Sequence, residues 1–378
     1  MSAPTHAAPA ADPIESTPER RLAVETEALV GGSIAAAVMG VIAAVLFAGG
    51  DWPLWGGLSV GIVAAAGALL TGLALGVIGY WRSRSLPGQE WRHDLRPWKF
   101  SLDEGTVSAV HAIIAAILTV CTFVLLQRSF EGLTVDVWVG TGLVAVTTGL
   151  VGYWIYLSVS SITTNKLASL LVLFMAVSTL ASMSTSQDPR WWEYHFSQLG
   201  TANDLSSALF NIALIVGGLF VTTFALYVNR DLVTLVRQGV LVHPWAPMAV
   251  SVVFIVMGVL LAGVGLFPLD VNMAVHNSCA IGMSLTFLAL LFSSPWVLRG
   301  MPRRFFVFCG ATAAVLLAGA VLFEPVGYWN LTAFELLAFS IIFGWISVFI
   351  RFIDAVAARG SDTSEAEPSR EPDPQLAA

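Results

Sequence analysis

Ten stretches of this chain are long, apolar and almost free of charge, and they constrain the fold more than any other feature. The hydrocarbon core of a bilayer is about 30 Å thick, and a helix of about 20 residues crosses it. Backbone polar groups inside hydrocarbon must be satisfied within the segment, so each stretch is predicted to be helical. The predicted spans are 29–48, 58–81, 106–127, 137–158, 167–185, 205–228, 246–266, 273–293, 305–323 and 331–351.

The composition excludes a soluble domain. The 378 residues are 56% hydrophobic and only 11% charged, with a mean hydropathy of +0.78. The predicted fold class is therefore all-α, a polytopic transmembrane helical bundle with ten spans and no strands. The net charge of −7 gives no indication of a nucleic-acid partner. Cys121, Cys279 and Cys309 lie inside apolar runs without CxxC spacing, which favours buried thiols over a disulfide framework.

The distribution of positive charge predicts the orientation. With the N-terminus inside, 16 of the 18 Lys and Arg residues fall in inner segments, and only Arg128 and Arg190 lie outside. Cytoplasmic loops carry such an excess of Lys and Arg, so both termini are predicted to be cytoplasmic. The predicted location is the plasma membrane, with multiple passes.

Composition also predicts the domain organisation. Residues 1–28 and 352–378 are rich in Ala, Pro, Ser and acidic residues, and we expect disordered cytoplasmic tails. Between them we expect a four-helix membrane module over 29–165 and a six-helix domain over 166–351. The inner loop 82–105 combines five basic residues with two tryptophans. We expect it to lie against anionic headgroups, or alternatively to dock a membrane-protein partner.

A candidate site lies on the predicted outer side. The middle third of every span lacks Asp, Glu, Lys and Arg, which disfavours ion-coupled transport. Polar side chains instead gather around the start of the sixth span and around the start of the eighth. The candidate ligand-binding residues are His195, Ser197, Asp204, Ser207, Asn211, Asp270, His276 and Asn277. They would line one outward-facing pocket if the sixth and eighth helices are neighbours.

Each candidate also has a structural explanation. Asp204 would be the N-cap of the sixth helix, and Asp270 or Asn272 the N-cap of the eighth. Asn211 would form a hydrogen bond between helices. His195, Asp204, Asp270 and His276 suffice in type for zinc, but they are widely separated in sequence, so no metal or other cofactor is predicted. A metal-dependent hydrolase would take Glu324 or Glu335 as its general acid or base.

Several short motifs resemble a known family. They are Ser197-Gln198-Leu199-Gly200, Ala208-Leu209-Phe210-Asn211, Gly217-Gly218, Gly263-Val264-Gly265-Leu266-Phe267-Pro268 and His276. This pattern resembles the bacterial membrane family called domain of unknown function 998 (DUF998), over roughly residues 166–351. The resemblance implies a six-helix bundle and no particular activity. Its layout is similar to six-helix DRAM- and Sfk-like membrane proteins, which suggests lipid organisation by analogy.

The functional hypothesis is a membrane protein whose outward-facing pocket binds a lipid headgroup or a cell-envelope precursor without covalent chemistry. His195 and the pair Trp191 and Trp192 would form a lid over the pocket. The membrane lipids are the expected partners. Three alternatives remain open: a metal-dependent hydrolase, a transporter of lipids or small molecules, and a scaffold for another membrane protein.

Overall fold

The computed structural model describes residues 18–86 and 88–365. Within these residues, ten helices are long and apolar enough to cross a membrane, which confirms the predicted ten-span helical class. The sidedness of the termini stays a prediction. Most of the two predicted tails, namely 1–17 and 366–378, lies outside the described residues.

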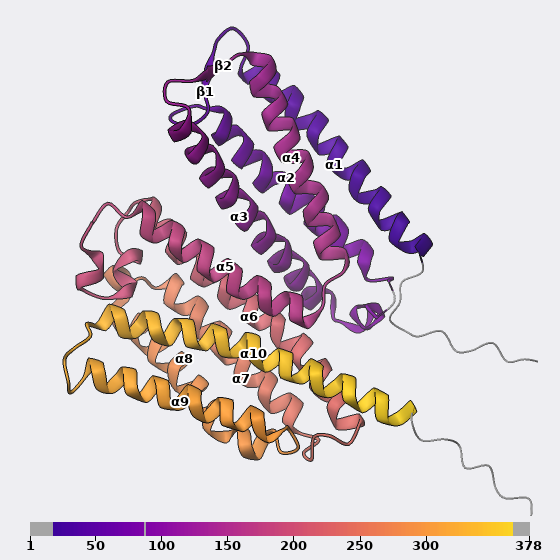
Figure 1. The fold of residues 1–378 in the computed structure, drawn as a ribbon, viewed down its shortest axis with the longest axis vertical. Helices are drawn as coiled ribbons and strands as arrows, with labels where there is room; N and C mark the ends of the chain where they lie inside the picture. The colour runs from indigo at the N-terminus through magenta and orange to yellow at the C-terminus, as the bar shows by residue number, and fades with distance from the viewer. Residues whose placement is uncertain (1–17, 87, 366–378) are drawn as a thin grey trace, which may run out of the picture. The chain divides into compact units, whose positions relative to one another are not determined.

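The chain divides into two compact units, Met1–Ile162 and Thr163–Ala378. The sequence placed the boundary between residues 165 and 166. The first unit contains four of the ten described helices and the second contains six (Figure 1).

The first unit is a bundle in which α4 packs along α1 and α2, while α3 packs along α2. Its helices are α1 (Pro18–Leu46), α2 (Val60–Ser83), α3 (Pro97–Ser129) and α4 (Val137–Ser160). Phe47, Phe123 and Val144 lie in its buried apolar core. A short antiparallel pair, β1 (Trp52–Pro53) with β2 (Thr134–Val135), joins two connections at one end of the unit. The expectation of no strands was therefore wrong at this one position.

The first helix begins earlier than predicted, at Pro18 rather than at 29. Its polar first turns are held by side chains of α4: the Tyr153 hydroxyl donates to Glu25 and the Tyr156 hydroxyl donates to Glu27. Polar residues that pair with a neighbouring helix can extend a span beyond its apolar stretch. The last helix is also longer than predicted and continues to Glu365 (Figure 1). Residues 18–28 and 352–365 are thus helical rather than disordered.

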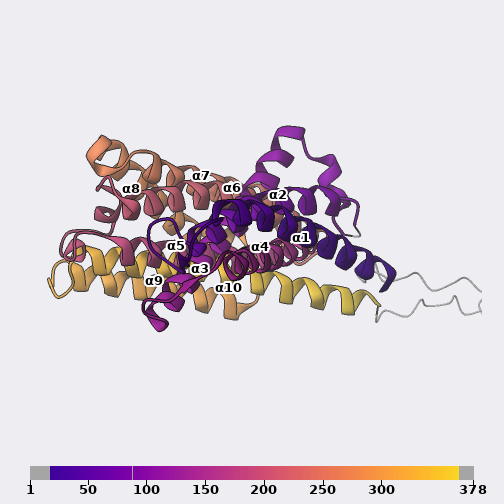
Figure 2. The ribbon, with the colours of Figure 1, turned by 90° about the horizontal axis from the view of Figure 1, so that it is seen from above.

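In the second unit, α6 packs against α5, α7 and α10, whereas α7 packs against both α6 and α8. The helices are α5 (Thr164–Thr185), α6 (Leu205–Arg237), α7 (Ala246–Leu266), α8 (Leu269–Val297), α9 (Arg303–Phe323) and α10 (Leu331–Glu365). Seen from above, α8, α7 and α6 follow one another on one side of this unit, and α9 and α10 lie on the other (Figure 2). The assumption that the sixth and eighth helices are direct neighbours was wrong, because α7 lies between them.

The backbones of α6 and α7 touch at two glycines. A Cβ atom on Gly218 would lie 2.4 Å from the Gly258 carbonyl oxygen, and one on Gly258 would lie 2.5 Å from the Gly218 carbonyl oxygen. Real side chains do not tolerate such distances, so both positions require glycine. Small residues commonly allow this close approach between membrane helices.

The start of α8 contains a kink at Asn272, whose backbone is not helical (φ −158°, ψ 90°). The Asn272 side-chain oxygen accepts a hydrogen bond of 3.1 Å from the backbone N–H of Val275. Asn272 therefore caps the regular part of the helix, as one of the structural explanations proposed.

Candidate functional site

The α5–α6 connection, residues 186–204, folds over one end of the second unit. It contains two short 3-10 helices, η2 (Trp191–Glu193) and η3 (Phe196–Gly200). Phe196 is buried and packs edge-on against Phe210 of α6, with ring centroids 5.1 Å apart, and against Phe339 of α10 at 5.5 Å. This aromatic contact anchors the connection on the helix bundle.

Two polar contacts from α10 and the residue before it hold the same connection. The backbone N–H of Phe196 donates to the Glu335 carboxylate at 2.6 Å. The Asn330 side-chain amide donates to the carbonyl oxygen of Trp192 at 2.7 Å. Sequence reasoning considered Glu335 only as a general acid or base and did not include Asn330. The sequence did contain an indication of this role. Glu335 is a carboxylate in the first turns of an otherwise apolar span, and such a group is costly unless it has a partner.

The polar stripe on α6 serves the fold. Asp204 is the N-cap of α6 and accepts a hydrogen bond of 2.9 Å from the Ser207 N–H, while the Ser207 hydroxyl approaches the Asp204 N–H at 3.2 Å. This reciprocal arrangement is a capping box. The Asn211 side-chain amide donates to the Gly200 carbonyl oxygen at 3.0 Å, which ties α6 to η3. Local hydrogen bonds therefore account for all three side chains.

His276 joins α8 to the end of α7. It is buried, with 3% of its surface exposed, and its Nδ1 lies 3.1 Å from the Val264 carbonyl oxygen and 3.0 Å from that of Phe267. Two carbonyl acceptors require a proton on Nδ1, so Nε2 is the acceptor in the neutral ring.

The end of α7 also contacts α6. A Cβ on Gly265 would lie 2.6 Å from the Asn211 carbonyl oxygen, so the two backbones are close at this turn.

His195, in the α5–α6 connection, lies within electrostatic range of His276. Burial, and next the positive charge that His276 can carry, lower the pKa of His195 below its ordinary value of 6.5. Its Nδ1 is buried and has no hydrogen-bond partner among the described residues. The surroundings of His195 therefore favour its neutral imidazole over the charged form.

Only part of the predicted set converges. His195, Asn211 and His276 gather around η3 and the facing ends of α6, α7 and α8. Asp270 and Asn277 are exposed instead. The described part of the chain contains no group of three or more His, Cys, Asp or Glu that could hold a metal ion, so the alternative zinc ligands are not brought together.

Beneath the connection lies a groove of about 350 Å³. Four helices and the connection contribute its lining: Phe196, Ser197, Phe210, Leu214, Leu261, Val264, Ala280, Ile281, Met283, Ser284, Leu285, Leu331, Phe334, Glu335, Ala338, Phe339 and Ile342. Ser197, Ser284 and Glu335 are its only polar members. Ile281 and Leu285 are 59% and 60% exposed, so the groove opens at the protein surface beside α8.

These observations define the class of the molecule: a multi-pass membrane protein with an apolar groove covered at one end by a connection between two helices. No protein-family model, curated protein or solved structure matches this chain, and the resemblance to domain of unknown function 998 therefore stays a prediction.

Proposed function

We propose that this protein resides in the plasma membrane and binds a lipid, or a lipid-linked envelope precursor, in the groove of its second unit. The predicted orientation places the α5–α6 connection on the outer side. The observation that carries the proposal is the groove itself: almost entirely apolar walls, an opening among exposed apolar residues of α8, and one carboxylate under the connection.

The size and position of the groove suit an acyl chain. Its volume of about 350 Å³ falls in the range of about 300–1,000 Å³ that ligand pockets occupy. The lining residues of α10 extend from Leu331 to Ile342, which corresponds to about 16 Å along a helix. Water is absent from the hydrocarbon region, so the exposed side chains of Ile281 and Leu285 would face lipid.

The polar end favours a headgroup that donates hydrogen bonds. The Glu335 carboxylate accepts one hydrogen bond from Phe196 in the structure, and a carboxylate has room for several. Ser197 also lines the groove. An ammonium or hydroxyl headgroup would donate to Glu335, whereas a trimethylammonium headgroup has no N–H to donate.

Retained lipid in purified full-length protein tests this function. The protein, in mild detergent, is incubated with equal amounts of phosphatidylethanolamine and phosphatidylcholine, and the bound lipid is counted by native mass spectrometry. We expect preferential retention of phosphatidylethanolamine. Ala338→Trp places an indole in the groove and should abolish retention, whereas Ala314→Trp, on an exposed face of α9, should not.

Two results would overturn the proposal. One is wild-type protein that retains neither lipid. The other is equal retention by the Ala338→Trp and Ala314→Trp variants, which would assign the lipid to the general surface of the bundle. Ser197→Ala tests the headgroup separately. The Ser197 side chain takes no part in the two hydrogen bonds that hold the connection to Glu335 and Asn330, so its loss should reduce selectivity without unfolding the protein.

A further inference from the structure

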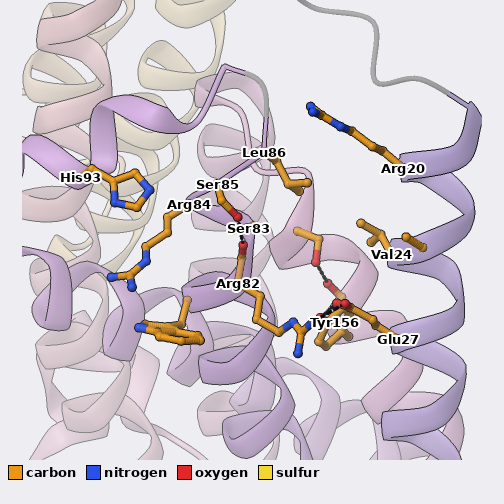
Figure 3. Close-up of a pocket in the computed structure, with 13 residues that line it drawn as sticks. Arg20, Val24, Glu27, Arg82, Ser83, Arg84, Ser85, Leu86, His93 and Tyr156 are labelled. Atoms are coloured by element: carbon orange, nitrogen blue, oxygen red, sulfur yellow. Dashed lines mark hydrogen bonds and ion pairs between the residues drawn. The ribbon is translucent and has the colours of Figure 1, made fainter.

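A second cavity, of about 650 Å³, lies in the first unit (Figure 3). It is formed by the first turns of α1, the end of α2 with the residues that follow it, the 3-10 helix η1 (Glu90–Asp94), and the end of α4. Its lining is Arg20, Ala23, Val24, Glu27, Trp81, Arg82, Ser83, Arg84, Ser85, Leu86, His93, Tyr156 and Ser160. It is thus unlike the apolar groove of the second unit.

Positive charge dominates this lining. Three arginines face one carboxylate, that of Glu27, which gives a net charge of +2 without His93. Glu27 is already engaged, because it pairs with Arg82 and accepts the Tyr156 hydroxyl. Arg20 makes no ion pair with the residues that the structure describes. Glu104 of α3, outside the lining, interacts electrostatically with Arg84.

Two of the three guanidinium groups are oriented by neighbours, because Arg82 pairs with Glu27 and Arg84 stacks on aromatic rings, whereas Arg20 is exposed. The Arg84 guanidinium lies 4.6 Å from the ring centroid of Trp81 and 5.7 Å from that of Phe100. Such stacking orients the planar guanidinium. Figure 3 shows Arg20 and His93 entering from opposite sides, with Arg82, Ser83 and Ser85 between them.

We propose that this cavity binds a phosphate monoester. Guanidinium groups match phosphate oxygens in bidentate hydrogen bonds, and a phosphate monoester carries about −1.5 to −2 charges at pH 7, which the lining charge of +2 balances. The Ser85 hydroxyl already donates to the Arg82 carbonyl oxygen at 3.1 Å, so the guanidinium groups are the donors on which the proposal rests. The group is either the headgroup of an anionic lipid such as phosphatidic acid or a soluble phosphomonoester, which share this chemistry.

Calorimetric titration of the purified full-length protein distinguishes the sources. The probes are dihexanoyl phosphatidic acid, glycerol 3-phosphate, inorganic phosphate and, as a control without a monoester, dihexanoyl phosphatidylcholine. We expect phosphatidic acid to bind and phosphatidylcholine not to bind. Binding of phosphatidic acid alone assigns a membrane lipid, while comparable binding of glycerol 3-phosphate assigns a soluble ligand.

Charge-removing variants locate the binding. Arg20→Gln and Arg84→Gln should each raise the dissociation constant about fivefold, and the double variant about 30-fold, as expected for the loss of cationic contacts near a membrane. Arg96→Gln is the matched control. Arg96 lies, like Arg84, in the connection between α2 and α3 and is exposed, but it does not line the cavity.

Three results would overturn the proposal: no binding of any monoester, unchanged affinity in the double variant, or equal weakening by Arg96→Gln, which would indicate diffuse attraction to a basic surface. Size-exclusion chromatography checks folding. Should the double variant aggregate, Arg20→Gln carries the test, because the Arg20 side chain is exposed and makes no ion pair with the described residues.

Discussion

The backbone N–H of Phe196 and the carboxylate of Glu335 are joined by a hydrogen bond of 2.6 Å, so the α5–α6 connection is fixed to α10 at the polar end of the groove. Glu335 lines the groove as well as holding the connection above it. One side chain therefore links the groove to its cover. A ligand that donates hydrogen bonds to this carboxylate would bind the same group that accepts from the N–H of Phe196.

Removal of this acceptor should loosen the connection. Glu335→Ala leaves the N–H of Phe196 without its acceptor, which should lower the free energy of unfolding by about 1–3 kcal/mol. Trypsin should then cut faster after Arg190, which is exposed in the connection. Glu335→Gln keeps a carbonyl acceptor and should resist the protease better. Glu324→Ala, at an exposed carboxylate at the end of α9, is the control. Equal cleavage rates in all variants would contradict this role.

His195 should make stability depend on pH. Its pKa in the folded protein lies below 6.5, so under acidic conditions the unfolded chain binds more protons at this residue than the folded protein does. The free energy of unfolding should therefore fall as the pH drops through 6.5 toward the folded pKa. The stability that depends on neutral His195 is fully present above pH 6.5. Thermal unfolding in detergent across this range should show a steeper decline for the wild type than for His195→Gln. Superimposable profiles would show that another group is responsible.

Adding one methyl group where α6 crosses α7 should destabilise the protein. Gly218→Ala would place its Cβ 2.4 Å from the Gly258 carbonyl oxygen and force the helices apart. We expect a loss of about 1–3 kcal/mol, as for other overpacked positions. Gly310→Ala in α9 meets no atom within 4 Å, and should be neutral or stabilising by up to about 1 kcal/mol. Chemical denaturation of both variants gives the comparison, and a tolerated Gly218→Ala would disprove the close contact.

The capping role of Asp204 can be tested by stability measurements. As the N-cap of α6, it should cost about 0.5–2 kcal/mol of stability when changed to Ala. Asp204→Ser keeps a capping oxygen without the charge, and should restore most of that stability. Asp270→Ala, at an exposed residue, should change little. If Asp204→Ser were as unstable as Asp204→Ala, the carboxylate charge rather than the cap would be the important property.

The helices could be predicted from sequence because each depends on a local property, an apolar run long enough for a bilayer. The cap at Asp204 also follows from local pattern. The tie between Phe196 and Glu335 could not be predicted, since it joins residues 139 positions apart and depends on how α10 packs. The early start of α1 was missed for the same reason: Glu25 and Glu27 look like tail residues until the tyrosines of α4 are placed beside them.

The exposed flank of the groove at Ile281 and Leu285 has a consequence for loading. An amphiphile that enters between these side chains never leaves its leaflet, so its occupancy follows its mole fraction in the bilayer rather than its aqueous concentration. Exchange is then a two-dimensional encounter. Adding host lipid, which lowers the mole fraction of the amphiphile, should empty the groove, whereas adding buffer should not.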